Sequence, residues 1–226
     1  MSHRWSAAVA LGSMLLLAGC SGGDEEDPAP GGDPGGTPPP SASAPVYTPF
    51  EKIPGDELLH TGIGEPLGIR VKAVDAMWTP ELAGESAAAG RHFLAVYFAA
   101  TGELADRAVK NARLTGLTLR ITPASGTCAK GLRLQEGEID CVTESYPRSQ
   151  LAEVADGEWR NFTWTNMRVM GSTIQRGETK IGVVGFSLPD TVDPTAFELC
   201  APTKEHPIDT TAFPCVPVKA PDNKRS

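Results

Sequence analysis

Apolar and polar side chains alternate over residues 67–73 and again over residues 117–121. Strict alternation over a short run is typical of a β-strand that turns one face towards the core. Thr79-Pro80 follows the first run and Pro123-Ala124-Ser125-Gly126 follows the second, so both predicted strands lead into residues that favour turns. The pattern therefore predicts a domain built from short strands.

Two longer runs, residues 92–99 and 181–188, carry apolar side chains at odd and even positions alike. A strand has this composition when both of its faces are covered. We expect the two runs to be the central strands of facing sheets, packed against each other. The predicted core residues are Phe93, Ala95 and Tyr97, or their alternates Leu94, Val96 and Phe98, against Val183, Gly185, Phe186 and Leu188.

Weaker signals complete the predicted set of elements. The runs 132–134 and 159–169 are further candidate strands, and residues 196–200 form the last one. The sizeable helix candidates are residues 104–114 and 147–155, and neither carries a full apolar stripe. Several short strands at this spacing predict a β-sandwich or a β-barrel.

Five segments share a characteristic pattern of apolar spacings: Gly68–Val71, Phe93–Phe98, Leu117–Gly126, Arg176–Glu178 and Gly185–Pro189. This pattern resembles an immunoglobulin-like domain of unassigned function that is common in actinobacterial and Firmicute lipoproteins, in a family labelled after a telomeric repeat-binding factor. The resemblance covers about residues 63–200. It implies an all-β, immunoglobulin-like β-sandwich outside the membrane, and no reaction. The chain has Thr101-Gly102-Glu103-Leu104 where the family has an Asn-Thr-Gly turn.

The N-terminus has the organisation of a signal peptide. A short basic segment precedes the uncharged apolar stretch Trp5–Leu17, which is too short to span a bilayer. It ends in Leu17-Ala18-Gly19-Cys20, which resembles the lipobox of bacterial lipoproteins. The resemblance implies that residues 1–19 are removed and that the thiol of Cys20 receives a diacylglyceryl group. The alternatives are an ordinary secreted protein cleaved nearby, with Cys20 incidental, or a buried core helix.

Residues 20–49 are expected to form a disordered linker after the lipidated cysteine. Residues 21–49 contain eight Pro and six Gly, and such a segment buries too little apolar surface to offset its ordering entropy. We interpret the acidic patch Asp24–Asp27 as a solvated spacer rather than a cation site. The predicted organisation is thus a signal peptide (1–19), a lipidated cysteine with its linker (20–49), and one domain with a cysteine-bearing tail (50–226).

The net charge of −8 and the lack of a basic stripe argue against nucleic acid as a partner. An even number of cysteines follows Cys20, and in an exported domain this indicates disulfides. Cys128 with Cys141 and Cys200 with Cys215 are the favoured pairs, with crossed pairing as the alternative. Zinc would require closer spacings such as Cys-x-x-Cys, so no metal is expected.

Candidate catalytic residues are few. His60, His92 and His206 are far apart in the sequence, and none has the spacing of a catalytic triad or a metal hydrolase. Gly84-Glu85-Ser86-Ala87 lacks the second glycine of a nucleophile elbow, so Ser86 is interpreted as an ordinary loop hydroxyl. No cofactor is implied.

Two other groups of side chains are candidates for a site. Glu136, Glu138 and Asp140 would share one face of a strand, where they can support acid/base chemistry or bind calcium, although a solvated face beside Cys141 is the favoured interpretation. Three tryptophans can stack on the sugars of a wall polymer or simply cover the sheets. They are Trp78, Trp159 and Trp164.

These features together predict a non-enzymatic, lipid-anchored protein of the bacterial envelope, held outside the cytoplasm by its membrane anchor. Its immunoglobulin-like domain is expected to bind another protein or to support an envelope assembly. A binding module for a small solute or a cell-wall glycan is the alternative, and a hydrolase is the less favoured third possibility.

Overall fold

A computed structural model describes most of the chain: residues 44–62, 67–129, 135–167 and 171–225. The predicted signal peptide, Cys20 and residues 21–43 of the predicted linker lie outside the described residues. So does the apolar run at 132–134.

The described residues form an all-β domain whose one helical segment is a short 3-10 turn, η1 (Phe50–Lys52). Its strands are, in chain order, β1 (Leu58–His60), β2 (Ile69–Thr79), β3 (Glu81–Leu82), β4 (Glu85–Ser86), β5 (Arg91–Gly102), β6 (Val109–Ala112), β7 (Thr118–Pro123), β8 (Thr127–Cys128), β9 (Glu138–Ile139), β10 (Val142–Glu144), β11 (Ser172–Ile174), β12 (Lys180–Pro189), β13 (Pro194–Cys200) and β14 (Cys215–Val218).

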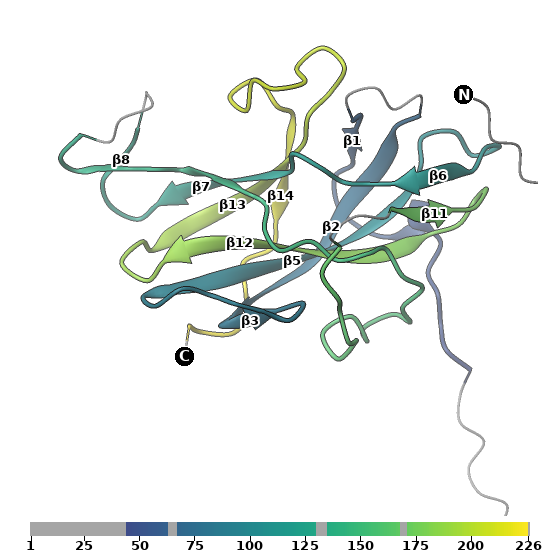
Figure 1. Ribbon diagram of the computed structural model, residues 1–226, viewed down its shortest axis with the longest axis horizontal. Coiled ribbons are helices and arrows are strands. Elements are labelled where there is room, and N and C mark those ends of the chain that lie inside the picture. The colour runs from purple at the N-terminus through teal and green to yellow at the C-terminus, as the bar shows by residue number, and fades with distance from the viewer. Residues whose placement is uncertain (1–43, 63–66, 130–134, 168–170, 226) are drawn as a thin grey trace, which may run out of the picture. The chain divides into compact units, whose positions relative to one another are not determined.

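Two antiparallel four-stranded sheets make up the fold. The first has the strand order β1-β2-β5-β12 and the second has the order β10-β7-β13-β14. Figure 1 shows β7, β13 and β14 in one layer and β2, β5 and β12 in the other. The predicted fold class, an all-β immunoglobulin-like β-sandwich, is confirmed.

The first sheet contributes its inner face to the main core. Leu94, Val96 and Phe98 alternate along β5 and pack in one buried cluster with Leu119 of β7 and Leu199 of β13. Both leucines are fully buried. The even-numbered side chains of β5 therefore pack against the second sheet. The alternation in β7 predicted that this strand turns one face towards the core, and Leu119 lies on that face.

The opposite face of β5 is covered as well, but not by a sheet. Ala95 and Tyr97 belong to a second buried cluster with Phe50, Val154 and Trp164, which come from η1 and from the irregular segment before β11. This outer layer explains why β5 is apolar at both parities.

The predicted arrangement of the two apolar runs is nevertheless wrong. β5 and β12 are neighbours in the same sheet, with Leu94 opposite Phe186 and Val96 opposite Val184. Both strands are apolar on two faces because the second sheet covers one face of their own sheet and the outer layer covers the other.

Three other sequence predictions also fail. Residues 159–167 form turns and loop rather than a strand, and the indole of Trp164 donates to the carbonyl oxygen of Trp159 at 2.8 Å. Residues 104–114 contain a turn and β6 instead of a helix. Residues 147–155 lie along the edge of β12, because Ser149 and Ala152 donate their amides to Val183 and Ile181, 3.0 and 2.8 Å away. The hydrogen bonds that this segment makes to the edge of β12 stabilise it more than a helix would, because such a helix would have no apolar stripe to bury.

The domain has one more strand than predicted in its cysteine-bearing tail, and it begins earlier than predicted. At the C-terminal end, β14 follows the predicted last strand and pairs with β13. At the N-terminal end, the folded unit begins at Ala44 rather than residue 50. There the amide of Asp156 donates to the carbonyl oxygen of Val46 at 2.9 Å, and its carboxylate accepts the amide of Thr48 at 3.1 Å.

Candidate interaction site

A groove of about 650 Å³ lies where the two sheets diverge, between the edge of β10 and the end of β12. Its floor is apolar and includes the buried side chains of Ile121, Leu188 and Val192. Glu138, Asp140 and Glu144 lie on one rim, with Arg91 across from them. We call this feature the acidic groove.

The path of the chain explains why the sandwich is open here. Ser145 still donates its amide to Leu117 beside β7, at 3.1 Å, but the next residue, Tyr146, donates to Gly185 of β12 at 2.8 Å. The chain therefore leaves the second sheet and joins the first within one residue. Beyond Gly185, towards the end of β12, no described strand fills the space between the two sheet edges.

A disulfide holds the acidic rim in place. Cys128 and Cys141 are bonded, with their Cα atoms 5.3 Å apart, which confirms this predicted pair. β8 and β9 pair in parallel just beside the bond, and Ala129 donates its amide to Ile139 at 2.9 Å. Closing a loop of this length removes about 3 kcal/mol of unfolded-state entropy in the chain-entropy model. The segment leading into β10 is thus anchored to the turn that follows β7.

The carboxylates predicted to share a strand face do not form a compact cluster. β9 is only two residues long, Glu136 lies before it in an exposed turn, and Asp140 lies after it. Glu138 accepts the amide of Gln135 at 2.9 Å, and Asp140 accepts the amide of Val142 at 3.1 Å. The described residues contain no group of three potential ligands able to hold a metal ion. Glu138 and Asp140 instead contribute to the charge of the groove, together with Glu144.

The structure places His60 and His92 far apart. His60 in β1 lies opposite Ile69, which lies opposite Gly102 at one end of β5, whereas His92 lies at the other end. Gly102, which is level with His60, lies ten residues along β5 from His92, a distance of roughly 33 Å. The His92 ring contacts the carboxylate of Asp190 at 2.7 Å.

The other candidate catalytic side chains lie elsewhere. His60 is fully buried, its Nε2 donates to the carbonyl oxygen of Thr115 at 2.8 Å, and burial lowers its pKa. His206 is exposed in the loop between β13 and β14, and Ser86 is exposed in the short β4 strand.

The tryptophans do not form an exposed row. Trp78 lies beneath the guanidinium of Arg225, 3.9 Å from its ring centre, and meets Phe197 edge-on. Trp159 donates its indole N–H to Asp75 at 2.9 Å. Trp164 is buried in the outer layer. The three tryptophans therefore cover the sheets, which is the second of the two interpretations given by the sequence.

A partly buried ion pair that the sequence did not reveal joins three distant segments. The guanidinium of Arg160 contacts both carboxylate oxygens of Asp75, at 2.6 and 2.8 Å, and reaches Asp222 at 3.0 Å. Burial raises the pKa of Asp75, but the bonds from Arg160 and Trp159 outweigh it, so the pKa lies below its ordinary value. Because these residues are up to 147 positions apart, no local pattern could have indicated the contact.

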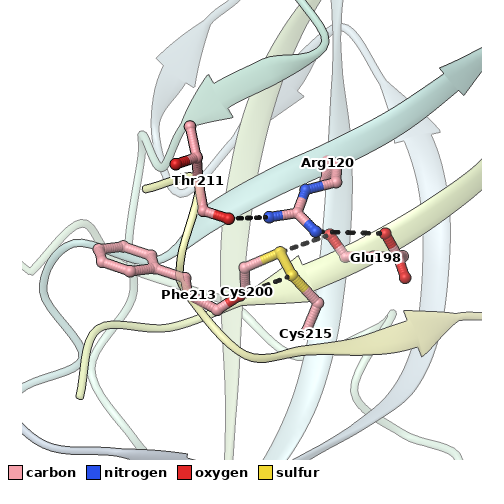
Figure 2. Close-up of a disulfide and its surroundings, with 6 residues drawn as sticks. All are labelled: Arg120, Glu198, Cys200, Thr211, Phe213 and Cys215. Atoms are coloured by element: carbon pink, nitrogen blue, oxygen red, sulfur yellow. Dashed lines mark hydrogen bonds and ion pairs between the residues drawn. A yellow bond between two sulfur atoms is a disulfide. The ribbon is translucent and has the colours of Figure 1, made fainter. Parts of the chain in front are cut away.

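The second predicted disulfide, Cys200 with Cys215, is also confirmed, and it joins directly paired residues of β13 and β14. Figure 2 shows Arg120 beside it, where the guanidinium donates to the carbonyl oxygen of Thr211 at 3.4 Å. The bond closes the loop 201–214, which presents Ile208 with 81% of its surface exposed. This loop is a second candidate contact surface.

Comparisons with protein-family models, with curated proteins and with solved structures found no match for the chain. Among the described residues, no helix has the length and apolar character needed to cross a membrane. The two disulfides are typical of a protein outside the reducing cytoplasm, so the domain is extracytoplasmic.

Proposed function

We propose that the protein is a non-catalytic, lipid-anchored component of the bacterial envelope whose immunoglobulin-like domain binds another protein. The observation that carries this proposal is the acidic groove, in which an apolar floor lies beside the edge of β10. Binding sites commonly combine an apolar concave surface with a few polar groups that set orientation. Among the described residues that line the groove there is no histidine and no serine, which favours binding over turnover.

The attachment of the linker supports this assignment. Phe50 donates its amide to Thr179, just before β12 begins, and Lys72 donates to the carbonyl oxygen of Ile53 at 2.9 Å. The groove lies beside Leu188 and Pro189 at the other end of β12, about 30 Å away along the strand. A lipid on Cys20 would therefore tether the domain by the end opposite the groove. A random coil with the length and composition of the predicted linker would span about 30 Å, which would leave the groove open to a partner.

In-cell crosslinking tests the proposal. A photo-crosslinking amino acid replaces the exposed Thr191 on the groove wall, and a matched variant carries it at the exposed Asp106, near the other end of β5. We expect a discrete protein adduct from position 191 and none of that mass from position 106. The same pattern of adducts from both positions, or no protein adduct at position 191, would contradict protein binding through the groove.

The predicted anchor has its own test. Cys20→Ser removes the thiol that accepts the lipid, so the protein should leave the membrane fraction or accumulate as an uncleaved precursor. Normal processing with continued membrane attachment would refute lipid anchoring.

One observation favours the alternative of a solute or glycan module. An apolar pocket of about 220 Å³ lies beside Trp159, with Ile53, Val74 and Ile181 among its walls. A bound solute would shift the fluorescence of Trp159, whereas Trp159→Phe would abolish that signal. Titration with soluble wall fragments therefore tests this second function directly.

A further inference from the structure

We propose that the acidic groove binds an extended peptide segment with basic side chains at alternate positions, which adds to β10 antiparallel as a fifth strand of the second sheet. This inference rests on the proposed function and names the kind of partner. Strand addition supplies affinity through main-chain hydrogen bonds and specificity through alternate side chains.

The first argument is the direction of the backbone groups of β10. Cys141 accepts the amide of Ile121 at 2.9 Å, and Ser145 donates to Leu117 at 3.1 Å, so the odd-numbered residues of this segment face β7. In an antiparallel ladder the residues between them, Val142 and Glu144, direct their N–H and C=O groups the opposite way.

Most of these outward groups are unpaired. The amide of Val142 bonds to the carboxylate of Asp140. Within the described residues, the two carbonyl groups and the amide of Glu144 meet no backbone partner across the groove. An unpaired row of this kind is a ready template for another strand.

The second argument is the pattern of charge. Asp140, Val142 and Glu144 have the same parity, so along the edge they read acidic, apolar, acidic. Residues opposite each other in an antiparallel pair have Cβ atoms roughly 4.5–5.5 Å apart, and opposite charges there are favourable. The matching strand therefore reads basic, apolar, basic at alternate positions.

The cation across the groove does not neutralise this rim. Arg91 is the one basic side chain among the described residues that line the groove. Its guanidinium is held by Ser187, with one bond of 2.8 Å to the hydroxyl and one of 2.6 Å to the carbonyl oxygen. The carboxylates of Glu138, Asp140 and Glu144 form no ion pair with a described residue.

The same charges disfavour a second copy of this chain. An antiparallel pair of β10 strands centred on Val142 would set Asp140 opposite Glu144, and a parallel pair in register would set each carboxylate opposite itself. Like charges directly opposite each other are destabilising. Charged edge strands resist self-association for this reason, yet they still accept a strand of opposite charge.

The third argument is rigidity. The Cys128–Cys141 disulfide and the pairing of β8 with β9 hold the segment before β10 in place without a partner. An edge that is already ordered loses less conformational entropy on binding, so more of the interaction energy appears as affinity.

Fluorescence anisotropy with a labelled Lys-Thr-Val-Thr-Lys peptide tests the proposal on the full-length protein in detergent. In the antiparallel register the first lysine faces Glu144, the valine faces Val142 and the last lysine faces Asp140. Glu144→Lys should weaken binding about tenfold, because an attraction becomes a repulsion. The peptide Glu-Thr-Val-Thr-Lys should restore binding to this variant, whereas Lys-Thr-Val-Thr-Glu should not.

Two matched controls separate strand addition from simple charge attraction. Asp106→Lys makes the same charge change far from the groove and should alter affinity less than about twofold, because the Debye length is about 8 Å at 0.15 M salt. Methylating the peptide nitrogen of the valine removes a bond to β10 and should weaken binding about tenfold, whereas methylating a threonine nitrogen, which points away, should have little effect.

The outcomes are distinct. Rescue by the first swapped peptide together with sensitivity to valine methylation supports the proposal. Equal binding of the methylated peptides, rescue by neither swapped peptide, or no binding of the basic peptide would overturn it. If the peptide does not bind but position 191 still crosslinks one protein, protein binding stands and strand addition of a basic segment is refuted. If position 191 yields no adduct, the proposed function itself fails.

Discussion

The outer edges of β2 and β10 differ in whether another part of the chain bonds to their backbone groups. The edge of β2 at Trp78 is closed by the C-terminal tail, where Asn223 accepts the Trp78 amide and donates to its carbonyl, both at 2.8 Å. The side-chain amide thus replaces the backbone of a neighbouring strand. No described residue covers the edge of β10 in this way, and Glu144 lies exposed beside a groove.

Contacts of two arginines, Arg225 and Arg160, hold the C-terminal tail against the edge of β2. Arg225 stacks on Trp78 and donates to the carbonyl oxygen of Pro189 at the end of β12 and to that of Val192 after it, at 3.2 and 2.6 Å. Arg160 adds the link between Asp75 and the tail. These contacts prevent the edge of β2 from pairing with a strand of another chain. Of the two edges, that of β10 is therefore the candidate surface for binding a partner.

The largest expected effect comes from the core beneath both edges. Phe186 is fully buried between the sheets, so Phe186→Ala should destabilise the domain by about 3–5 kcal/mol. Urea unfolding followed by tryptophan fluorescence measures the loss. Leu104→Ala, at a position with 41% of its surface exposed, is the control and should change stability by less than about 0.5 kcal/mol. Similar losses in both variants would contradict the assignment of the core.

Removing the disulfide between β13 and β14 should have the next largest effect. Cys200→Ala with Cys215→Ala releases a loop closed over 15 residues and should cost about 3 kcal/mol. Thermal unfolding of the double variant, compared with the wild type under reducing and oxidising conditions, checks this. If reduction destabilised the double variant as much as the wild type, the loss would have to be assigned to the other bond.

Opening the closed edge should cost less. Asn223→Ala leaves the N–H and C=O of Trp78 without partners and should destabilise the domain by about 1–3 kcal/mol. Thr143→Ala at the open edge should be close to neutral, since its side chain has no hydrogen bond among the described residues. Chemical denaturation of both variants sharpens the comparison, and it fails if Asn223→Ala is as neutral as Thr143→Ala.

The smallest expected effect is a dependence of stability on pH. Burial lowers the pKa of His60 below its ordinary value of 6.5, so the unfolded chain binds this proton more readily than the folded one. Stability from this residue is therefore present above pH 6.5 and is lost as the pH falls below it, by at most about 1.4 kcal/mol per pH unit.

A variant isolates that effect. His60→Gln keeps a group able to donate to Thr115 but cannot titrate, so its stability should vary less between pH 7 and pH 5 than that of the wild type. Denaturation midpoints at several pH values measure the difference. An unchanged pH profile would show that His60 is not the titrating group.

Periodicity revealed which faces of the strands are covered, but not what covers them. β5 and β12 are apolar on both faces, and the structure confirms that both faces are buried. The pattern is the same whether the cover is a facing sheet or an irregular layer around Trp164, which is why the predicted placement of β12 was wrong. The disulfides could be predicted because even cysteine counts and short spacings restrict the choices.

The parts of the structure that escaped prediction lack a local signal in the sequence. β14 contains Pro217, which argues against a central strand and is tolerated here because β14 is an edge strand. The bond between Trp78 and Asn223 spans 145 residues. The carboxylates near residue 140 stood out in the sequence, but only the crossing of the chain from β7 to β12 makes them the rim of a groove.

Amide hydrogen exchange at Glu144 and Trp78, measured by NMR with and without the Lys-Thr-Val-Thr-Lys peptide, tests the central claim most directly. In the protein alone, the amide of Trp78 should be protected by Asn223 and that of Glu144 should exchange fast. Adding the peptide should slow exchange at Glu144 and leave Trp78 unchanged. A Glu144 amide that is already protected in the protein alone, or one that stays unprotected when the peptide saturates, would contradict an open edge that accepts a basic strand.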